Sequence, residues 1–552
     1  MSPLKRYFNL LRLDKKDIFQ IISYAIFAGI ISLSLPLGIQ AIINFIQAGR
    51  ASVSWVVLVI LVVLGVAFVG ILSVMQLRIT ENLQQKIFIR SAFEFSYRIP
   101  KLKFNATYNK HSSDIANRFF DTLSIQKGTS KLLTDFSAAL LQILFGIILL
   151  SLYHPFFIIF GILLTLLLYM IFKFSYDSGL KTSLKESKFK YKVAGWLQEL
   201  SKNSFSFKNP NQLDFALDKN NKLVNDYINY REQHFKVIKR QFLQLITFKI
   251  IITASLLLIG GFLVLNQQMN IGQFVAAEII ILLVINSVEK IILGLETFYD
   301  VLTSVEKIGQ VTDLEIEPES NTIQTNCTIN LSLELENVSF KFSDDKVYVL
   351  DDINLKIAQG EKITIEGDNG AGKTTLFRIL TGLIQPTQGH FIINDDTFNK
   401  MDINQYRTHF GSILQDETLF EGTIFENLTY NNPNISNEDI KWALDNLKLT
   451  NFIKTLPEGL QTPIIPDGKQ LSSSNIQKIL LARCILNKPR ILFLENPTDK
   501  MDQQTAKEII AFLMDPNQKW TVIVTSNNKE FSNNSNRIIT MEKGKISNIL
   551  NK

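Results

Sequence analysis

A chain of 552 residues is too long for one ordinary domain and suits two or three. Hydrophobic residues make up 46% of the chain and lie mostly in about its first 300 positions, which argues against a wholly soluble protein. The net charge of +6 comes without a basic and aromatic platform, and Lys and Arg cluster beside apolar runs. We therefore expect a lipid bilayer as partner and no nucleic acid.

The chain begins with an amphipathic stretch, 1–16, whose basic residues predict an elbow helix on the cytosolic side of a membrane. An apolar run at 18–46, with Pro36 as a kink, predicts the first membrane helix. This run is too long for a signal-peptide core, so we expect it to remain in the protein. A second apolar run at 53–77 continues into a charged, helix-periodic stretch, which predicts a helix that extends into the cytosol.

Four further apolar runs complete a bundle of about six membrane helices, at 136–152, 156–174, 243–265 and 274–293. The polar, Lys-rich stretch 175–241 predicts a second long cytosolic extension, and such extensions can reach a partner domain. Loops at one face carry almost no Lys or Arg, so we expect a multi-pass protein of the inner (plasma) membrane with both termini in the cytosol.

The composition changes after the last apolar run. We expect a transmembrane domain with cytosolic helical extensions at 1–302, a polar linker at 303–330, and a domain of alternating strands and helices at 331–552. The two cysteines, Cys327 and Cys484, lack metal or redox spacing, which predicts a reducing compartment and no disulfide.

The most specific motif is EKITIEGDNGAGKTTLFRIL, in which a β-branched strand meets a glycine-rich loop and then a helix. Such glycines let backbone N–H groups approach phosphates closely, and the helix N-terminus favours the same negative charge. Lys373 adds a charge for the β- and γ-phosphates, and the Thr374 hydroxyl can reach Mg²⁺. The motif predicts ATP and Mg²⁺ as ligands of Gly367, Asp368, Asn369, Gly370, Ala371, Gly372, Lys373, Thr374 and Thr375.

With this loop, the chain resembles the ATP-binding-cassette (ABC) family over essentially its whole length. The resemblance implies a type I exporter fold, a membrane α-helical bundle followed by an α/β P-loop nucleotide-binding domain. In VSFKF, Phe342 takes the position that stacks on adenine, and in FGSILQDETLFEGTIFENL, Gln415 takes the Q-loop position near Mg²⁺. SSDIANRFFDTLSIQKG resembles the family's first coupling segment. The sequence is most similar to half-transporters of type I secretion and bacteriocin export. We expect it to lack the peptidase domain that some of these carry.

Positions that carry hydrolysis in the family are altered here. The family's Leu-Ser-Gly-Gly-Gln signature is replaced by LSSSN, so Ser472, Ser473 and Ser474 stand where the motif caps the γ-phosphate of the opposing subunit. Serine adds Cβ atoms where backbone approaches phosphate, although its hydroxyl still donates hydrogen bonds. Asp502, in the D-loop, is retained as a nucleotide-site residue.

The Walker B motif ends in Glu495 and Asn496, where the family has Asp and Glu. Glu495 can still hold Mg²⁺ through water, but an amide cannot accept the proton of the attacking water, so Asn496 is not a general base. The switch-histidine position is Asn527, or Ser526 if the register slips by one residue. A register that makes Glu495 the base would leave Leu494 to hold Mg²⁺, which is chemically implausible. We expect a domain that binds ATP and hydrolyses it slowly or not at all.

Charged residues in the last two spans have two interpretations. Lys249, Glu289 and Lys290 fit snorkelling or pairing near the cytosolic membrane edge better than substrate contact, whereas the role of Glu278 stays open.

The leading hypothesis is an ATP-binding half-transporter that dimerises, as homodimer or heterodimer, to export a substrate such as a peptide or protein. The alternatives are a nucleotide-regulated membrane scaffold that transports nothing, and an assembly subunit for a periplasmic adaptor of a secretion system. The sequence identifies no substrate.

Overall fold

The computed structural model describes residues 1–47, 53–108, 112–317, 331–342, 347–394, 396–398, 402–415 and 417–552. The chain divides into two compact units, Met1–Leu102 with Lys110–Glu315, and Lys103–Asn109 with Ile316–Lys552. Residues 318–330 of the expected linker, with Cys327, lie outside the described residues.

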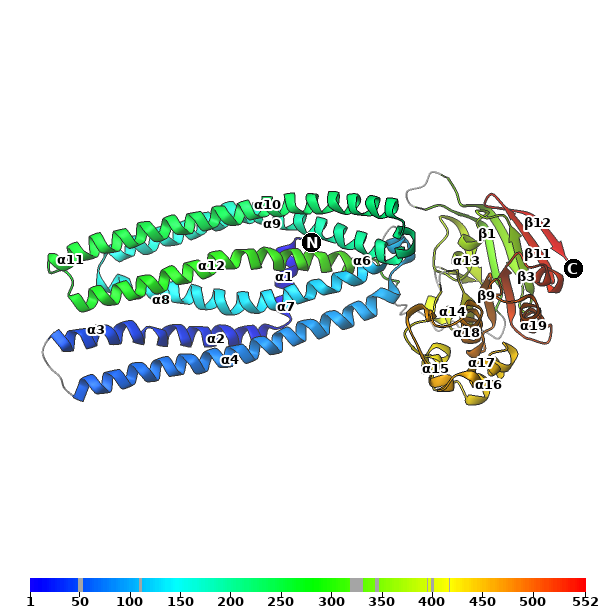
Figure 1. Cartoon of the computed structure of the whole chain (residues 1–552), viewed down its shortest axis with the longest axis horizontal. Helices are drawn as coiled ribbons and strands as arrows, with labels where there is room; N and C mark the ends of the chain where they lie inside the picture. The colour runs from blue at the N-terminus through cyan, green and yellow to red at the C-terminus, as the bar shows by residue number, and fades with distance from the viewer. Residues whose placement is uncertain are drawn as a thin grey trace. The chain divides into compact units, whose positions relative to one another are not determined.

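Figure 1 shows the first unit as long helices, and its regular elements among the described residues are all helical. Among the described residues, six helices are long and apolar enough to cross a membrane, which confirms the expected bundle. The helices are α1 (Pro3–Arg12), α2 (Lys15–Ser32), α3 (Ser34–Gln47), α4 (Val53–Arg98), α6 (Ser112–Asn117), α7 (Asp121–Lys131), α8 (Ser137–Tyr153), α9 (Phe156–Lys202), α10 (Pro210–Ser255), α11 (Gly261–Leu265) and α12 (Ile271–Thr312).

Local sequence sets where these helices begin and end. Ser2 caps α1 ahead of Pro3, and Asn270 and Gln273 form a capping box at the start of α12, with N–H to side-chain distances of 2.7 and 3.0 Å. The first apolar run breaks between Ser32 and Ser34, so Pro36 lies in the first turn of α3, as the expected kink requires.

Helix length confirms that some helices extend well beyond a membrane span. The 47 residues of α9 span about 70 Å, roughly twice the ~30 Å hydrocarbon core. The helix α10 has nearly the same length and packs along α9. The helix α12 runs to Thr312 and so continues into the stretch expected as a linker.

Burial identifies the centre of this unit. Half of the most apolar window of α12 is buried, against 11% of that of α4, so α12 is the inner helix and α4 presents apolar side chains outward, as a lipid-facing helix does. Ile280, Val284 and Val288 of α12 are almost fully buried against α8 and α10.

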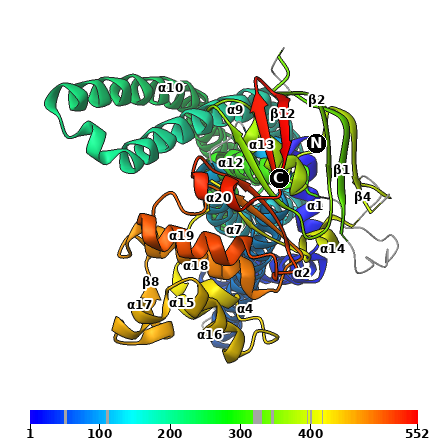
Figure 2. The ribbon, with the colours of Figure 1, turned by 90° about the vertical axis from the view of Figure 1, so that its right-hand side faces the viewer.

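The second unit contains two main sheets, which confirms the expected α/β class and adds an antiparallel sheet that the sequence did not reveal. Strands β3, β6, β9, β10 and β11 are parallel and β12 is antiparallel at one edge, in the order β12-β11-β3-β10-β9-β6. The second sheet has the order β2-β1-β4-β5, and Figure 2 shows β2, β1 and β4 side by side.

The strands of these sheets are β1 (Leu333–Phe340), β2 (Leu350–Ile357), β3 (Lys362–Gly367), β4 (Gln388–Ile393), β5 (Asp396–Thr397), β6 (Phe410–Ile413), β9 (Ile491–Glu495), β10 (Thr521–Thr525), β11 (Arg537–Glu542) and β12 (Lys545–Asn551). A short pair joins β7 (Gly422–Thr423) to β8 (Pro463–Ile464). The helices are α5 (Phe104–Thr107), α13 (Lys373–Leu380), α14 (Ile403–Arg407), α15 (Ile424–Thr429), α16 (Asn437–Asn446), α17 (Thr450–Thr455), α18 (Ser473–Leu486), α19 (Gln503–Met514) and α20 (Lys529–Asn534).

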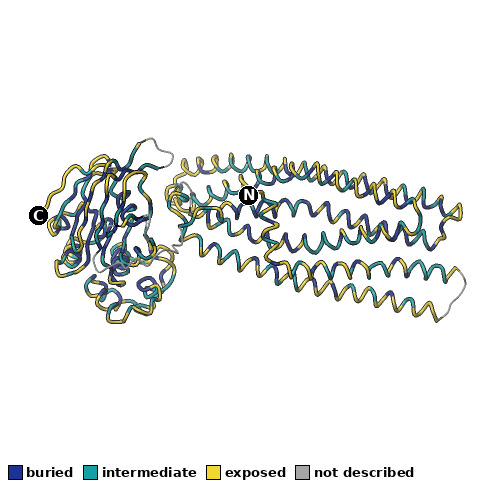
Figure 3. Tube along the Cα trace, turned by 180° about the vertical axis from the view of Figure 1, so that it is seen from behind, coloured by how far each residue is buried: buried dark blue, intermediate teal, exposed yellow. Residues whose placement is uncertain are grey.

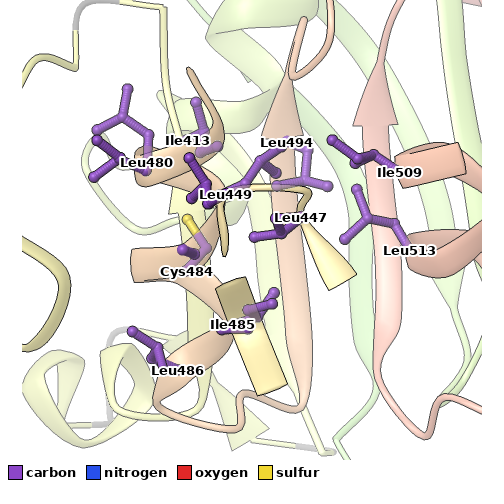
Figure 4. Packing of buried hydrophobic residues seen from close by; sticks show 14 of the residues in the cluster. Ile413, Leu447, Leu449, Leu480, Cys484, Ile485, Leu486, Leu494, Ile509 and Leu513 are labelled. Carbon is purple, nitrogen blue, oxygen red and sulfur yellow. The ribbon is translucent and has the colours of Figure 1, made fainter. Parts of the chain in front are cut away.

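Every residue of β9 and β10 is buried, and Figure 3 shows dark blue segments in the interior of this unit. Figure 4 shows Leu494 of β9 and Ile509 of α19 in the same apolar cluster as Cys484. The Cys484 thiol donates to the Ser412 carbonyl at 2.8 Å, and burial raises its pKa well above the usual value. This cysteine is therefore a packing residue rather than a reactive thiol.

Candidate nucleotide-binding site

The glycine-rich loop lies between β3 and α13, as the motif predicts. A Cβ on Gly367 would lie 2.3 Å from the Met541 carbonyl oxygen, and one on Gly372, whose φ is +99°, would lie 2.8 Å from a Leu350 methyl. Only glycine fits these two positions. Asp368, Asn369 and Gly370, between them, are exposed. The loop thus presents backbone to solvent, as phosphate binding requires.

The first side chain of α13, Lys373, contacts the backbone of the glycine-rich loop. The Lys373 ammonium donates to the carbonyl oxygens of Gly367 and Asp368, the latter at 2.9 Å, so the positive charge lies within the loop. Thr375 is buried, and Ala371 packs in the core beneath the loop. The charge and the exposed backbone fit a polyphosphate.

Thr374, Gln415 and Glu495 meet beside this loop. Glu495 ends β9 and is 5% exposed; its carboxylate accepts from the Thr374 hydroxyl and, at 3.1 Å, from the Gln415 backbone N–H. A hydroxyl and a carboxylate are hard oxygen donors of the kind that Mg²⁺ takes. In the described part of the chain, no group of three or more His, Cys, Asp or Glu side chains could hold a metal ion.

Asn496 occupies the turn directly after Glu495. Its φ is +48°, its N–H donates to the Thr525 carbonyl at 2.9 Å, and its carbonyl accepts from the Gln477 side chain at 2.7 Å. Gln477 also accepts from the Lys500 N–H at 3.0 Å, so this residue of α18 fixes both ends of the turn. A single amide within a helix gives no sequence signal by itself, so the role of Gln477 is visible only in the structure.

The switch position adjoins the same turn, because Thr525 of β10 pairs with Glu495. Ser526 is 2% exposed and accepts from the Asn528 N–H at 3.1 Å, whereas Asn527 is exposed. The structure thus places Asn527, rather than Ser526, on the open side of the turn.

The serine-rich segment lies at the N-terminus of the 14-residue helix α18. The Ser472 hydroxyl accepts from the Asn475 N–H at 3.2 Å as a helix cap, Ser473 is exposed and Ser474 is half-buried. Asp502 caps α19 by accepting from the Thr505 N–H at 2.9 Å, which lowers the pKa of its carboxyl group. The cap gives Asp502 a structural contact; its place in a nucleotide site stays a prediction.

Phe342 is half-buried and stacks on Tyr108, with ring centroids 4.3 Å apart and an interplanar angle of 10°. Tyr108 belongs to Lys103–Asn109, the part of the N-terminal half that clusters with the second unit. The stretch 112–128 that resembles a coupling segment belongs instead to the first unit, as α6 and α7. The sequence signal that could have indicated this contact is a pair of aromatic residues, Phe104 and Tyr108, four positions apart in a polar stretch.

In the first unit, Lys249 of α10 donates to the Glu289 carboxylate of α12, so this pair is matched in charge. Glu278 is half-buried. Neither arrangement assigns a substrate contact.

Comparison with known proteins extends these observations. The family model for the ABC transporter transmembrane region matches residues 18–288, and the ABC transporter model matches 350–499. The α-hemolysin translocation ATP-binding protein HlyB of Escherichia coli is 31% identical over 288 residues, 52% of this chain and 41% of that protein. The leukotoxin export ATP-binding protein LtxB of Aggregatibacter actinomycetemcomitans is 31% identical over 320 residues, 58% of this chain and 45% of that protein.

The match thus spans less than half the length of these relatives. A solved structure of a bacterial Atm1-family ABC exporter with ATP bound superimposes with a TM-score of 0.84 over 97% of this chain and 95% of that one. At 18% identity this likeness shows the fold alone.

Proposed function

Because the chain belongs to the ABC transporter family, with the transmembrane region and the ABC domain both matched, we propose that it is an ATP-binding half-transporter with impaired hydrolysis. Two copies, or this chain and a second half-transporter, pair in the inner membrane with their termini in the cytosol. ATP bound between the paired domains then biases the membrane helices between inward- and outward-facing states.

One observation carries the proposal: a complete phosphate loop lies beside a turn that lacks the general base. In the proposed site, Lys373 and the loop backbone hold the phosphates, and Thr374 and Glu495 hold Mg²⁺, which neutralises phosphate charge when bound. Asn496 orients water through its amide but cannot take up a proton. ATP binding is thereby retained while its cleavage is slow.

We propose a polypeptide as the exported substrate. The similarity to proteins named for translocation of α-hemolysin and export of leukotoxin supports this class. A periplasmic adaptor is a further proposed partner on the same ground. The test compares polypeptides released by cells that produce the wild-type chain or Lys373→Ala. Polypeptides released only with the wild type support export, and identical sets from both refute it.

The second candidate is a nucleotide-regulated membrane scaffold, which the Asn496 turn favours because such a protein needs no hydrolysis. Differently tagged copies purified from one membrane distinguish pairing: capture of one tag with the other supports a homodimer. A scaffold predicts that ATP binding changes which proteins copurify while the released polypeptides stay the same.

A further inference from the structure

Two aromatic side chains of Lys103–Asn109 contact the nucleotide side of the second unit. The Arg378 guanidinium lies over the Phe104 ring, with its central carbon 4.7 Å from the ring centroid. Arg378 belongs to α13, the helix that begins at the phosphate loop. Four residues on, Tyr108 lies parallel to Phe342. The segment is therefore fixed at two points, one on the phosphate-loop helix and one on the aromatic residue in the adenine position.

The strand that precedes Phe342 is connected to the phosphate loop through Val349. The Phe340 carbonyl accepts from the Val349 N–H at 2.8 Å, and the Val349 carbonyl oxygen lies 3.0 Å from where a Cβ on Gly372 would be. Phe342 also packs edge-to-face on the buried Phe340, with centroids 5.0 Å apart. This contact holds Phe342 against the core, and Tyr108 covers one face of its ring.

Stacking on an aromatic ring requires a free face, and one face accommodates one planar partner. An adenine base that stacks where Tyr108 lies must replace the Tyr108 ring. We propose that Tyr108 competes with the adenine of ATP for Phe342, so that ATP binding displaces Tyr108 and the segment that carries it. The inference rests on the proposed ATP binding and adds the residue that opposes it.

In the chain, the segment is joined to Leu102 and Lys110, which belong to the first unit. Displacement of Tyr108 therefore acts on a segment that is covalently joined to the first unit. A ligand with phosphates but no base leaves Tyr108 in place.

The test measures binding of ATP and of inorganic tripolyphosphate, each with Mg²⁺, by calorimetry to the full chain in lipid nanodiscs. The Tyr108 side chain is 50% exposed, so Tyr108→Ala leaves no core cavity. We expect Tyr108→Ala to bind ATP about three- to tenfold more tightly than wild type, the strength of one lost aromatic pair. Tyr108→Phe, the matched control, keeps the ring and binds ATP as wild type does, and tripolyphosphate binds all three equally.

Equal or weaker ATP binding by Tyr108→Ala would overturn the inference, as would an equal gain for tripolyphosphate, which would indicate general opening of the site. In a Phe342→Ala background, Tyr108→Ala should give no further gain, because the shared ring is gone. A gain that persists there also overturns the proposal. If neither wild type nor Tyr108→Ala binds ATP, the proposed function falls too; ATP binding without the gain removes this inference alone.

Discussion

Asn496→Glu is the sharpest test of impaired hydrolysis. The substitution supplies a carboxylate directly after Glu495, where the amide cannot act as a base. General-base catalysis contributes about 10²–10⁴-fold, and we expect a gain near the lower limit because the signature serines and Asn527 remain. Turnover at saturating ATP should therefore rise by about 100-fold.

The structure also indicates how much folding stability this substitution costs. Asn496 has φ +48°, a left-handed conformation that Asn tolerates and that costs most other L-residues about 1–2 kcal/mol. For a unit of this size, the Tm should fall by roughly 2–8 °C. Its backbone bonds to Thr525 and Gln477 do not depend on the side chain, so the turn should keep its shape.

The assay is phosphate release by the purified full chain in nanodiscs. The control is Asn496→Gln, because Gln has the length of Glu but no carboxylate. It separates the effect of a general base from the effect of a longer side chain. Turnover in Asn496→Gln that matches Asn496→Glu would show that charge is not the cause. Robust wild-type turnover, unchanged in Asn496→Glu, refutes the reasoning outright.

Three further changes test neighbouring features. Lys373→Ala should weaken ATP binding by at least about 100-fold because it removes the loop's charge, while the exposed Lys469→Ala should bind as wild type; equal affinities would contradict the assignment of the loop. Ser473→Gly with Ser474→Gly, in the Asn496→Glu background, should raise turnover further by letting backbone approach phosphate; an unchanged rate would show that the serines do not limit it. Lys362 is 3% exposed, and burial lowers its pKa to about 8. Its folded pKa lies below the unfolded ~10.4, so wild-type stability relative to Lys362→Met should rise between about pH 8 and pH 10, by up to about 3 kcal/mol. Thermal melts that show no rise would contradict this.

Hydropathy was sufficient to predict the membrane helices, and the phosphate-loop motif was sufficient to predict the strand, loop and helix around Lys373. Both signals are local, since about 20 apolar residues, or one short motif, determine the structure. The antiparallel sheet was missed because its strands are interrupted by polar residues and because β1 pairs with a distant segment, as Leu333 does with Ile393.

The remaining features of the site could not be predicted because they depend on contacts between residues far apart in the sequence. Tyr108 and Phe342 are far apart in the chain, and neither position carries a motif that names the other. The relation between Gln477 and Asn496 likewise depends on how α18 packs beside β9. The structure buries Ser526 and exposes Asn527, and the assignment of the switch position to Asn527 stays a prediction.

Gln477 has a consequence for cooperativity. Its side chain connects the helix that begins with the signature serines to the turn after Glu495 within one chain. In a dimer, the signature would serve the partner's ATP and the turn would serve the chain's own. A single amide would then let each site's occupancy alter the affinity of the other, so that the two nucleotides bind as a coupled pair.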